Sequence, residues 1–582
     1  MFTDFVENRV EIGRIEPIQP RHSSRYSELH YLGALVFGAL RRGRRTQHYT
    51  DSQMNIVVAD PLPASAIELL RSVTGWSVDA RAQRPLDALK ADLAEADALI
   101  VRSATTVDRA LIESAPRLRV IARAGTGVDN VDVEAATERG ILVMNAPGAN
   151  SVSVAELAMT LMLALSRGVA PADAAMKRGV WDKKKLVGAE LRGKTLGVVG
   201  LGRIGQEVAS RARAFAMTIV AHDPFISEQV AESMDITLLS LDDLCARADY
   251  ITLHVPATSE TRHLFGRERL AACKAGVRIV NTARGELIDE EALADAIESG
   301  SVAGAGLDVF ENEPPGDSRL VKLPQVLATP HIAASTVEAQ ELVGTETAAA
   351  VRDYLQSGTI ANAVNFPSVR GDEAAQLRPF MTLAERMGTL LAQIASGRTH
   401  GIGVRYYGPL LGAHGPLLAS AAIAGTLRPI LSTSVTFVNA RAVAEQRGIE
   451  IVESRSSRPR DYANLLSLKL QTTEGERWIE GTVFETGTPR LELIDGIDVE
   501  APLEGNMLVI RNEDQPGVIG EVGTILGRHG INIAGFSLGR GRGGAIGVVN
   551  MDAGQQDEHV EAAVKELRGV AAIRQVCLVR LA

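Results

Sequence analysis

The chain has 582 residues, roughly four times the length of a usual single domain, so several domains are expected. Apolar residues make up 46% of it and charged residues 23%, an ordinary globular composition that argues against a largely disordered chain. The formal net charge of −10, without a domain-sized basic surplus, argues against a dedicated nucleic-acid binder.

Three cysteines, Cys245, Cys273 and Cys577, lie far apart in the sequence, and none belongs to a CxxC or CxxxC pattern. This spacing excludes a disulfide framework and a thiolate zinc site, and it suits a reducing compartment. No apolar run approaches the length needed to cross a bilayer. We therefore expect a cytoplasmic protein of several domains, with no metal and no membrane partner.

Residues 1–53 differ in character from the rest of the chain. Their apolar run, 31–40, is followed by the arginine cluster of 41–45, which is the reverse of the order in a secretory signal. At Met54 the pattern changes, and 55–59 is typical of a buried strand. We expect the folded protein to open at Met54 and the extension to be disordered or a mis-assigned start. A basic tether is the alternative.

From residue 54 to about 370, short apolar runs alternate with amphipathic stretches, the pattern of parallel βα units. Two of the expected helices are Ser65–Ser72 and Ser153–Arg167. The candidate strands, all short and apolar, are 55–59, 98–102, 118–122, 141–144, 196–200, 218–222, 250–254, 277–281 and 326–328.

Residues 370–505 follow a different pattern, with one long helix candidate, Leu377–Ala395, and then alternating strands such as Ile402–Tyr407 and Trp478–Thr486. This predicts a separate α+β domain. Several of its arginines are candidates for binding anions, although scattered arginines are more often a solvated surface. They are Arg428, Arg441, Arg447, Arg455, Arg458 and Arg460.

The tail, 506–582, predicts a compact βαββαβ unit of the ferredoxin-like kind. Turn residues separate the elements: Asp514-Gln515-Pro516-Gly517 after the first strand, and Gly541 to Gly544 between the second and third. The expected elements are strand 507–512, helix 518–529, strands 531–538 and 545–551, helix 558–567 and strand 573–581.

A dinucleotide-binding fingerprint, Gly200-Leu201-Gly202-Arg203-Ile204-Gly205, follows one predicted strand and opens a helix. Gly200 would make the tight turn, Gly202 would let the backbone approach the pyrophosphate, and Gly205 would allow close helix–strand packing. Asp223 ends the next strand, 18 residues after Gly205, where it would accept both ribose hydroxyls and repel a 2′-phosphate. The motif therefore predicts NAD in preference to NADP.

Three later segments each present a polar residue near the end of an apolar strand: Arg284, Glu313 and His331. Separately, they would be explained as a surface charge, a loop acid and a structural histidine. Together they suit the oxidation of a 2-hydroxy acid, with histidine as the base for the hydroxyl proton and a carboxylate fixing its ring. Arginine supplies the planar, bidentate donor that a substrate carboxylate needs.

These motifs resemble those of a known family. The fingerprint, Asn281-Thr282-Ala283-Arg284-Gly285 and Pro330-His331 resemble the D-isomer-specific 2-hydroxyacid dehydrogenases. Val101-Arg102-Ser103-Ala104-Thr105, the segment from Arg123 to Asn130 and the long C-terminal extension narrow this to the long-type D-3-phosphoglycerate dehydrogenase branch. The resemblance covers about 54–582.

The resemblance implies an α/β architecture in which a Rossmann-type nucleotide domain, 150–335, is inserted in a flavodoxin-like substrate domain. The substrate domain is made of 54–149 and a return segment, 336–369. An intervening α+β domain of the allosteric substrate- or anion-binding kind, 370–505, and an ACT regulatory domain, 506–582, would follow.

The resemblance further implies NAD-dependent oxidation of 3-phospho-D-glycerate to 3-phosphooxypyruvate, the first step of L-serine synthesis, with Arg284, Glu313 and His331 as the catalytic residues. Another D-2-hydroxyacid dehydrogenase and a non-catalytic NAD-sensing scaffold are the alternatives. The expected NAD contacts are Thr126, Gly200, Gly202, Arg203, Ile204, Gly205, Asp223, Thr282, Ala283, Arg284, Asp308, His331, Ile332, Ala333 and Ala334.

Four residues are expected to bind the substrate. Arg102 and Ser103 follow a predicted strand, and an arginine with a hydroxyl can hold a phosphate dianion. Gly125 and Asn150 are further substrate contacts by resemblance. A rim charge is the alternative for Arg102.

The tail carries the expected regulatory site. Its resemblance to an ACT domain implies self-association, as a homotetramer or dimer, and L-serine as an effector bound between paired tails. The expected serine contacts are Asn512, Asp514 and Asn532. The alternative is that Asp514 only caps a helix and Asn532 only shapes a turn.

Overall fold

The computed structural model describes residues 53–582, apart from 182, 368–371, 432–433, 542, 553 and 582. The expectations for residues 1–52 therefore lie outside the described residues. Strand β1 (Met54–Val58) opens at the expected residue. Within this part of the chain, no single helix has the length and apolarity to span a membrane. Helices α6 (Ser151–Arg167) and α7 (Val169–Lys177), which meet at a bend of 66°, reach that length and apolarity only when they are taken together.

The first sheet has five parallel strands in the order β2-β1-β3-β4-β5. This is the flavodoxin-like order, whose switch point lies between β1 and β3. Its further strands are β2 (Trp76–Asp79), β3 (Ala98–Val101), β4 (Val120–Arg123) and β5 (Leu142–Met144). Its helices are α2 (Ala64–Arg71), α3 (Leu86–Leu93), α4 (Arg109–Glu113) and α5 (Val133–Glu138).

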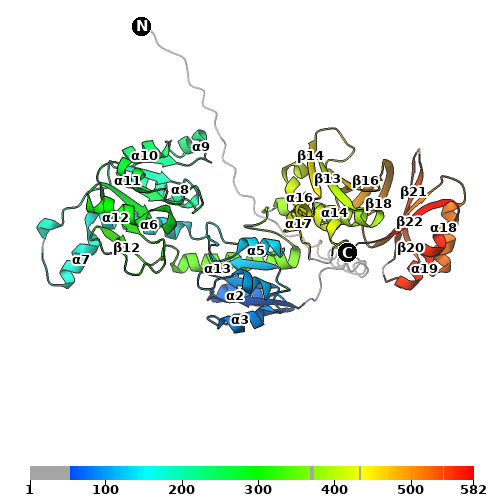
Figure 1. Ribbon diagram of the computed structural model, residues 1–582, viewed down its shortest axis with the longest axis horizontal. Helices are drawn as coiled ribbons and strands as arrows, with labels where there is room; N and C mark the ends of the chain where they lie inside the picture. The colour runs from blue at the N-terminus through cyan, green and yellow to red at the C-terminus, as the bar shows by residue number, and fades with distance from the viewer. Residues whose placement is uncertain are drawn as a thin grey trace, which may run out of the picture. The chain divides into compact units, whose positions relative to one another are not determined.

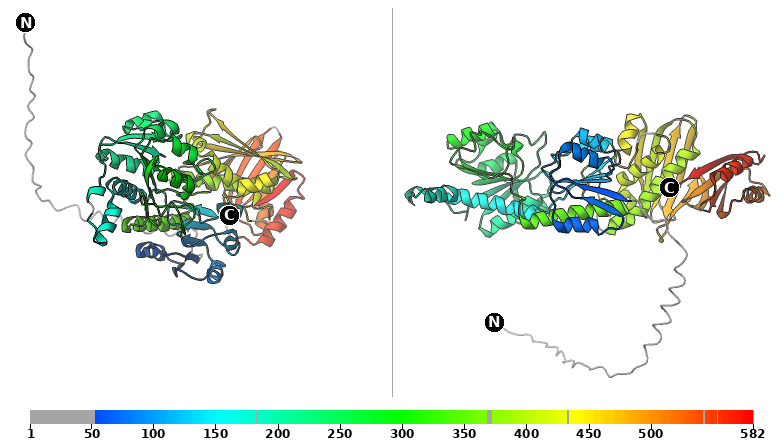
Figure 2. Two further views of the ribbon diagram at one scale, coloured as in Figure 1. Left: turned by 60° about the vertical axis from the view of Figure 1, so that its left-hand side comes forward. Right: turned by 90° about the horizontal axis from the view of Figure 1, so that it is seen from below.

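Helix α13 (Val337–Ser357), from far along the chain, completes this first domain (Figures 1 and 2). It packs against α2, and its buried Ala348, Val351 and Tyr354 share one hydrophobic core with Ile56 of β1 and Ala66 of α2. This first domain is therefore discontinuous in sequence, because its core needs a helix from beyond the second sheet.

The second sheet has seven parallel strands in the order β12-β11-β10-β9-β6-β7-β8, the Rossmann order with one strand added. Its strands are β6 (Thr195–Val199), β7 (Thr218–His222), β8 (Thr237–Leu238), β9 (Tyr250–Leu253), β10 (Val277–Asn281), β11 (Val302–Leu307) and β12 (Val326–Ala328). Besides α6 and α7, its helices are α8 (Arg203–Ala214), α9 (Glu228–Ser233), α10 (Leu241–Arg247), α11 (Arg267–Ala272) and α12 (Glu290–Glu298), with short 3₁₀ turns at Lys183–Lys185 and Gly285–Leu287.

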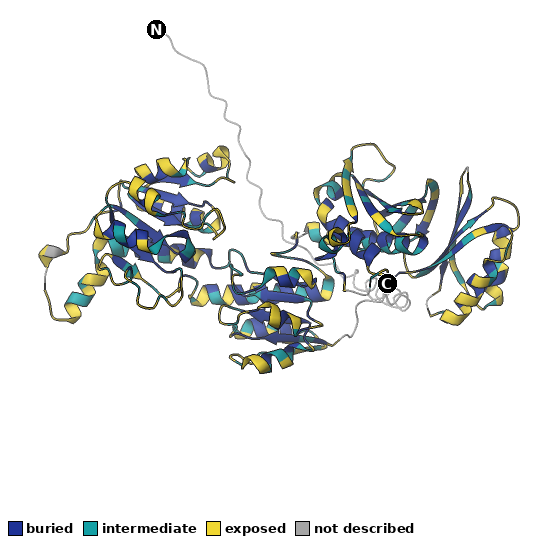
Figure 3. Cartoon of the chain, viewed as in Figure 1, coloured by how far each residue is buried: buried dark blue, intermediate teal, exposed yellow. Residues whose placement is uncertain are grey.

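Two of the strands that the sequence pattern missed have evident physical reasons. Strand β11 is mostly glycine and alanine, so it shows no apolar run, because helix α6 lies close: a Cβ on Gly306 would be 2.9 Å from the Cβ of Leu161. Strand β2 is a short edge strand with a half-buried pattern. In every sheet the buried residues follow the strands, while the exposed ones lie mainly on the outer faces of the helices (Figure 3).

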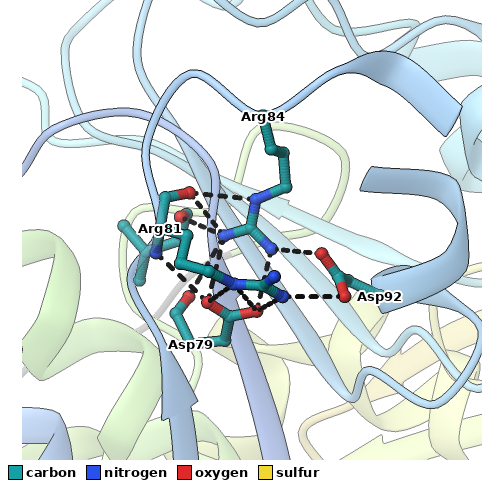
Figure 4. Close-up of polar contacts among 5 residues, drawn as sticks. Asp79, Arg81, Arg84 and Asp92 are labelled. Atoms are coloured by element: carbon teal, nitrogen blue, oxygen red, sulfur yellow. Dashed lines mark hydrogen bonds and ion pairs between the residues drawn. The ribbon is translucent and has the colours of Figure 1, made fainter. Parts of the chain in front are cut away.

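An ion-pair network stabilises this edge strand (Figure 4). Arg84, whose side chain is only 5% exposed, pairs with Asp79 at 2.9 Å and Asp92 at 2.6 Å, and it donates to the carbonyl of Val58 at 3.0 Å. Arg81 also pairs with both acids, and its hydrogen bond is the main cause that lowers the pKa of Asp79. The network joins the end of β2 to the end of β1.

The third sheet has six strands in the order β14-β13-β15-β16-β17-β18, antiparallel except for the β13–β14 pair. Its strands are β13 (Thr399–Tyr407), β14 (Glu450–Ser456), β15 (Leu465–Thr472), β16 (Gly475–Val483), β17 (Pro489–Ile494) and β18 (Ile497–Pro502). Its helices are α14 (Asp372–Ile394), α15 (Pro409–Ala413), α16 (Gly415–Leu427) and α17 (Ala440–Gln446). Helix α14 begins five residues before the predicted start, with Pro379 inside it.

The fourth sheet is antiparallel, in the order β20-β21-β19-β22, and the predicted βαββαβ order is confirmed. Its elements are β19 (Asn506–Asn512), α18 (Val518–Arg528), β20 (Ile533–Gly541), β21 (Gly544–Met551), α19 (Asp557–Leu567) and β22 (Ile573–Arg580). Strand β20 runs past its predicted end at residue 538, because Gly539 and Gly541 let β18 approach closely.

The third and fourth sheets share one hydrophobic core. Leu383 and Leu390 of α14 lie in the same buried cluster as Val509, Val548 and Val579 of the fourth sheet. The side chain of Gln393 also exchanges two hydrogen bonds of 3.0 Å with the backbone of Arg580. The intervening and C-terminal domains are therefore packed together through a common apolar interior.

Candidate active site

The glycine fingerprint lies at the switch point of the second sheet, between β6 and β9. Gly200 follows β6 with a φ of +92°, and Gly202 is the N-cap of α8, with open space where a side chain would stand. A Cβ on Gly205 would lie 2.1 Å from the carbonyl oxygen of Gly200. This geometry fits the three tasks predicted for the glycines, and it leaves the first N–H groups of α8 available to a pyrophosphate.

Asp223 stands at the end of β7, directly beside the glycine loop. Its Oδ2 accepts a hydrogen bond of 2.8 Å from the N–H of Leu201, and its Oδ1 accepts one of 2.9 Å from the N–H of Phe225. The carboxylate is therefore held where an adenosine ribose would lie if the pyrophosphate meets α8.

Thr282 gives an independent indication of a ligand. It is 6% exposed, and its Oγ1 is buried without a hydrogen-bond partner among the described residues. A buried hydroxyl without a hydrogen-bond partner is costly, so a ligand or water in the crevice is expected to supply the missing hydrogen bond. The residues present therefore fit a bound dinucleotide at the carboxyl edge of this sheet.

Asp308 is fully buried, and its carboxylate holds the loop that carries the predicted histidine. Its Oδ1 accepts from the Oγ1 of Thr329 at 2.6 Å and from the N–H of Ile332 at 2.9 Å, while its Oδ2 accepts from the N–H of Ala333 at 2.8 Å. Its direct contact with NAD stays a prediction, as does that of Ala334, but the carboxylate clearly shapes this loop.

Glu313 and His331 are in direct contact. Glu313 Oε2 lies 2.7 Å from His331 Nδ1, and Glu313 Oε1 accepts a hydrogen bond of 3.2 Å from the N–H of Phe310. The backbone N–H of His331 donates to the carbonyl of Asp308 at 2.8 Å. With Nδ1 engaged by the carboxylate, Nε2 is the ring nitrogen left for a substrate hydroxyl, and the half-exposed side chain is accessible to it.

Arg284 contacts the first domain through Asp129. One terminal nitrogen donates to the carbonyl of Ala283 at 2.6 Å, and the other lies 2.9 Å from Asp129 Oδ2, which also accepts from Nε at 3.1 Å. Asp129 was not among the predicted site residues. Its side chain is 74% exposed, so the pair lies at the solvent side of the crevice.

Arg123, at the end of β4, is a second residue that the sequence reasoning missed. A Cβ on Gly125 would lie 1.5 Å from a terminal nitrogen of Arg123, so the glycine leaves room for this guanidinium. Burial, followed by the positive charge of Arg284, lowers the pKa of Arg123, and its Nε has no partner among the described residues. The rule that identified Arg102, an arginine at a strand end, applies equally to Arg123.

Arg102 lies at the switch point of the first sheet. Its N–H donates to the buried Asp60 at 2.6 Å, and its carbonyl accepts a hydrogen bond of 2.7 Å from Asn130. Ser103 is exposed beside it. The positive charges of Arg284 and Arg102 both contribute to lowering the pKa of Arg123. Three arginines from three strand ends therefore lie near one another.

Thr126 and Asn150, predicted to contact NAD and substrate respectively, meet each other. Thr126 Oγ1 donates to Asn150 Oδ1 at 2.9 Å. Arg203, another predicted NAD contact, donates to the carbonyl of Pro147 at 2.6 Å. The glycine loop is thus tied to the segment that connects the two domains.

The three predicted serine contacts do not meet within one chain. Asn512 pairs with Ala545 at one end of the fourth sheet, whereas Asn532 precedes Ile533, which pairs with Met551 at the other end. Residues 545 and 551 are about 20 Å apart at a rise of about 3.4 Å per residue. Asp514 pairs with Arg540 at 3.3 Å, and Asn532 donates to Asp552 at 2.5 Å.

Family sequence profiles match three parts of the chain. The profile described as "D-isomer specific 2-hydroxyacid dehydrogenase, NAD binding domain" matches residues 159–333. That of the "D-3-phosphoglycerate dehydrogenase intervening domain" matches 376–495, and that of the "ACT domain" matches 506–572. These matches support NAD as the cofactor.

Full-length relatives are similar over most of the chain. A D-3-phosphoglycerate dehydrogenase of Methanocaldococcus jannaschii is 43% identical over 91% of this chain and 100% of its own. One from Bacillus subtilis is 39% identical over 83% of this chain and 92% of its own. A crystal structure of a protein from Thermus thermophilus, 38% identical, matches 53% of this chain and 100% of its own with a TM-score of 0.50.

Proposed function

Since the chain belongs to the D-3-phosphoglycerate dehydrogenases, we propose that it oxidises 3-phospho-D-glycerate to 3-phosphooxypyruvate with NAD. The contact between Glu313 and His331 is the observation that carries this proposal. It puts a ring-orienting carboxylate and a base on the edge of a sheet that has the glycine loop of a dinucleotide site.

The chain's own residues supply binding, orientation and proton transfer. His331 Nε2 would take the proton of the C2 hydroxyl, while Glu313 holds the ring and stabilises the charge that develops on it. Arg284 would bind the substrate carboxylate and orient C2. NAD, when bound, supplies the acceptor for the hydride of C2.

The arginines support a phosphorylated substrate. Arg102, Arg123 and Arg284 lie near one another at the crevice, and guanidinium groups suit a phosphate dianion as well as a carboxylate. The experiment is a spectrophotometric assay of the purified protein that follows NADH with 3-phosphoglycerate, and in parallel with 2-hydroxyglutarate. No NADH from 3-phosphoglycerate, at any protein concentration, would reject the proposed substrate.

We infer that L-serine binds between two C-terminal domains. Asn512 and Asn532 lie at opposite ends of one sheet, so a compact site with both needs Asn532 of a second copy. Asp514 would take the ammonium group and the start of α18 the carboxylate. Because serine acts at a distance from the crevice, it can inhibit only by preferring an arrangement of the domains that is less active.

We propose a homotetramer held by two different interfaces. Helix α7 has no buried residue, and the segment around it exposes Met176, Trp181 and Val187, the last two at 79% and 88%. Apolar exposure of this kind is typical of a protein–protein interface. One interface through this segment and one through the C-terminal sheets would generate a closed tetramer. Light scattering tests this arrangement by measuring the mass of Trp181→Glu in solution. We expect this variant to form dimers.

We also propose that the intervening domain binds an anion. Arg455 and Arg458 line a cavity of about 510 Å³ together with Tyr407, whereas Arg428 and Arg441 are paired with acids. Calorimetric titration of inorganic phosphate into the full-length protein and into Arg455→Gln tests this site.

We propose that the enzyme acts in the cytoplasm. Fractionation of cells of the native source would test this location.

A further inference from the structure

A loop of the intervening domain, 434–439, contacts the C-terminal end of helix α5 in the substrate-binding domain. Thr436 Oγ1 donates to the carbonyl of Gly140 at 2.9 Å, and Asn439 Nδ2 donates to the carbonyl of Glu138 at 3.2 Å. The last carbonyls of a helix have no partner within the helix, so the hydrogen bond to Glu138 meets an acceptor that needs one, while Gly140 lies just past the end of α5. The contact is close, since a Cβ on Gly140 would lie 2.6 Å from Thr436 Oγ1.

The same loop enters the hydrophobic core of the substrate-binding domain. The ring centroid of Phe437 is 5.0 Å from that of Phe366 and 6.5 Å from that of Tyr354, and Val438 belongs to the buried cluster of that domain. A loop anchored by buried apolar groups and by two backbone carbonyls at and just past the end of α5 cannot slide freely over the surface. It therefore joins the two domains at a defined position.

The loop is also fixed within its own domain. The N–H of Thr436 donates to Asn439 Oδ1 at 2.8 Å, and Asn439 Nδ2 donates back to the carbonyl of Ser434 at 3.1 Å. Helix α17 follows at once and packs against α16 and β14. A displacement of the intervening domain is therefore carried to this loop.

The other end of α5 leads directly to the crevice. Asp132 caps the helix by accepting a hydrogen bond from the N–H of Ala135. Just before it in the chain, Asp129 and Asn130 contact residues of the candidate site. Asn130 Nδ2 donates to the carbonyls of Arg102 at 2.7 Å and Thr105 at 2.6 Å. Asp129 Oδ2 lies 2.9 Å from Arg284.

We propose that residues 129–140 are a relay by which loop 434–439 positions the substrate-binding arginines Arg102 and Arg284. The proposal rests on the proposed function, because it assigns Thr436 and Asn439 as positioning residues for that substrate. The intervening domain then acts on substrate affinity through α5. Asp223 and the glycine loop, which are expected to bind NAD, belong to the domain of the second sheet and do not depend on α5, since Asp223 accepts a hydrogen bond from the loop itself.

The test uses matched threonine variants of the full-length protein. Thr436→Val removes the donation to Gly140 at nearly constant volume, and Thr436→Ser retains it. Thr482→Val is the control, because Thr482 Oγ1 makes a comparable donation of 2.7 Å to Asn464 inside the intervening domain, away from α5. Asn439→Asp keeps the acceptor for the Thr436 N–H and loses the donations to Glu138 and, within the loop, to Ser434.

We expect Thr436→Val and Asn439→Asp to raise the KM for 3-phosphoglycerate about fivefold, the lower range of measured couplings. The KM for NAD should change less than twofold, and Thr436→Ser should restore the wild-type value. In a double-mutant cycle with Asn130→Ala, the effects on KM should be less than additive, because both changes break one chain of contacts. Equal changes in the two KM values, or additive effects, would overturn the relay.

A second readout does not depend on turnover. Hydrogen–deuterium exchange of peptides within 127–139 should be faster in Thr436→Val than in the wild type, with α8 unchanged. Thr482→Val should leave 127–139 unchanged. If wild-type protein fails to oxidise 3-phosphoglycerate, the proposed substrate is wrong, and the exchange experiment still decides the relay. Unaltered exchange across 127–139 would reject it even in an active enzyme.

Discussion

His331 and Glu313 link two parts of the crevice edge, the loop after β12 and the loop after β11, with 2.7 Å between Nδ1 and Oε2. Both partners are anchored further, Glu313 through the N–H of Phe310 and His331 through the carbonyl of Asp308. A base held in one orientation by its neighbour should behave in mutagenesis as part of a unit rather than as an isolated side chain.

For this pair we expect His331→Ala to lower kcat by about 10²- to 10⁴-fold, the usual contribution of a positioned base. Glu313→Ala should lower kcat less, because the base remains but its ring is free to rotate. The double variant should be no slower than His331→Ala. Steady-state kinetics of the three proteins check this, and multiplicative losses would show that the two residues act independently.

Arg284→Ala should reduce kcat and raise the KM for 3-phosphoglycerate, since the substrate carboxylate is then neither bound nor oriented. Arg284→Lys should recover little, because an ammonium group cannot form the bidentate contact. The matched control is Arg319→Ala, an exposed arginine paired with Glu298 in the same domain. Kinetics with saturating NAD measure both parameters, and full recovery by lysine would contradict bidentate binding.

Removal of Arg102 or Arg123 should distinguish phosphorylated from unphosphorylated substrates. We expect Arg102→Ala and Arg123→Met to raise the KM for 3-phosphoglycerate at least about tenfold, as expected for the loss of about 1.4 kcal/mol from a charged hydrogen bond. The KM for 2-hydroxyglutarate should change far less. Equal losses on both substrates would remove these arginines from a phosphate site.

The buried His254 predicts a pH dependence of stability. Burial lowers its pKa to about 3, and its Nδ1 has no partner among the described residues. The unfolded histidine has a pKa of about 6.5, so between these values only the unfolded chain binds the proton. Stability should therefore fall as the pH drops from about 6.5 toward 3, by about 1.4 kcal/mol per unit from this group.

The comparison of wild type with His254→Gln isolates this effect. Thermal melting at about pH 7 and about pH 4.5 should show a smaller loss of melting temperature in the variant, because glutamine takes up no proton. His263→Gln, at an exposed histidine of the same domain, serves as the control. Identical pH dependence in wild type and His254→Gln would show that His254 is protonated in the folded protein.

The serine site allows a test by complementation. Asp514→Asn and Asn532→Ala should each abolish serine inhibition, because every site then lacks one partner. In oligomers that contain both variant chains, one site of each pair regains all its residues, so part of the inhibition should return. Inhibition curves of the mixed and unmixed proteins measure this, and a mixture as insensitive as its parents would contradict a site shared between chains.

Removal of the C-terminal domain is a less suitable experiment. A chain that ends near residue 500 would lack Val509, Val548 and Val579, which share one buried cluster with α14 and the third sheet. Loss of regulation in such a chain would be confounded with damage to a shared core. Point variants at the sheet ends leave that core intact.

The elements and motifs that depend on local pattern were predictable from the sequence. The glycine fingerprint, Asp223 and the βαββαβ tail follow from periodicity and turn residues, which act over a few neighbouring positions. Even His331 and Glu313 were identified, because parallel strands bring their ends to one edge. Strand β11 was missed because its small residues are required by a helix from elsewhere in the chain.

Only the tertiary structure decided which groups share an environment. Arg123 joins the candidate site because Gly125 leaves space for it and Arg284 lies near it from another domain. Asp129, the contact of Thr436 with α5 and the separation of Asn512 from Asn532 likewise depend on residues distant in sequence. The physical reason is that local sequence determines backbone conformation and amphipathic faces, whereas burial and charge pairing depend on which faces the whole fold brings together.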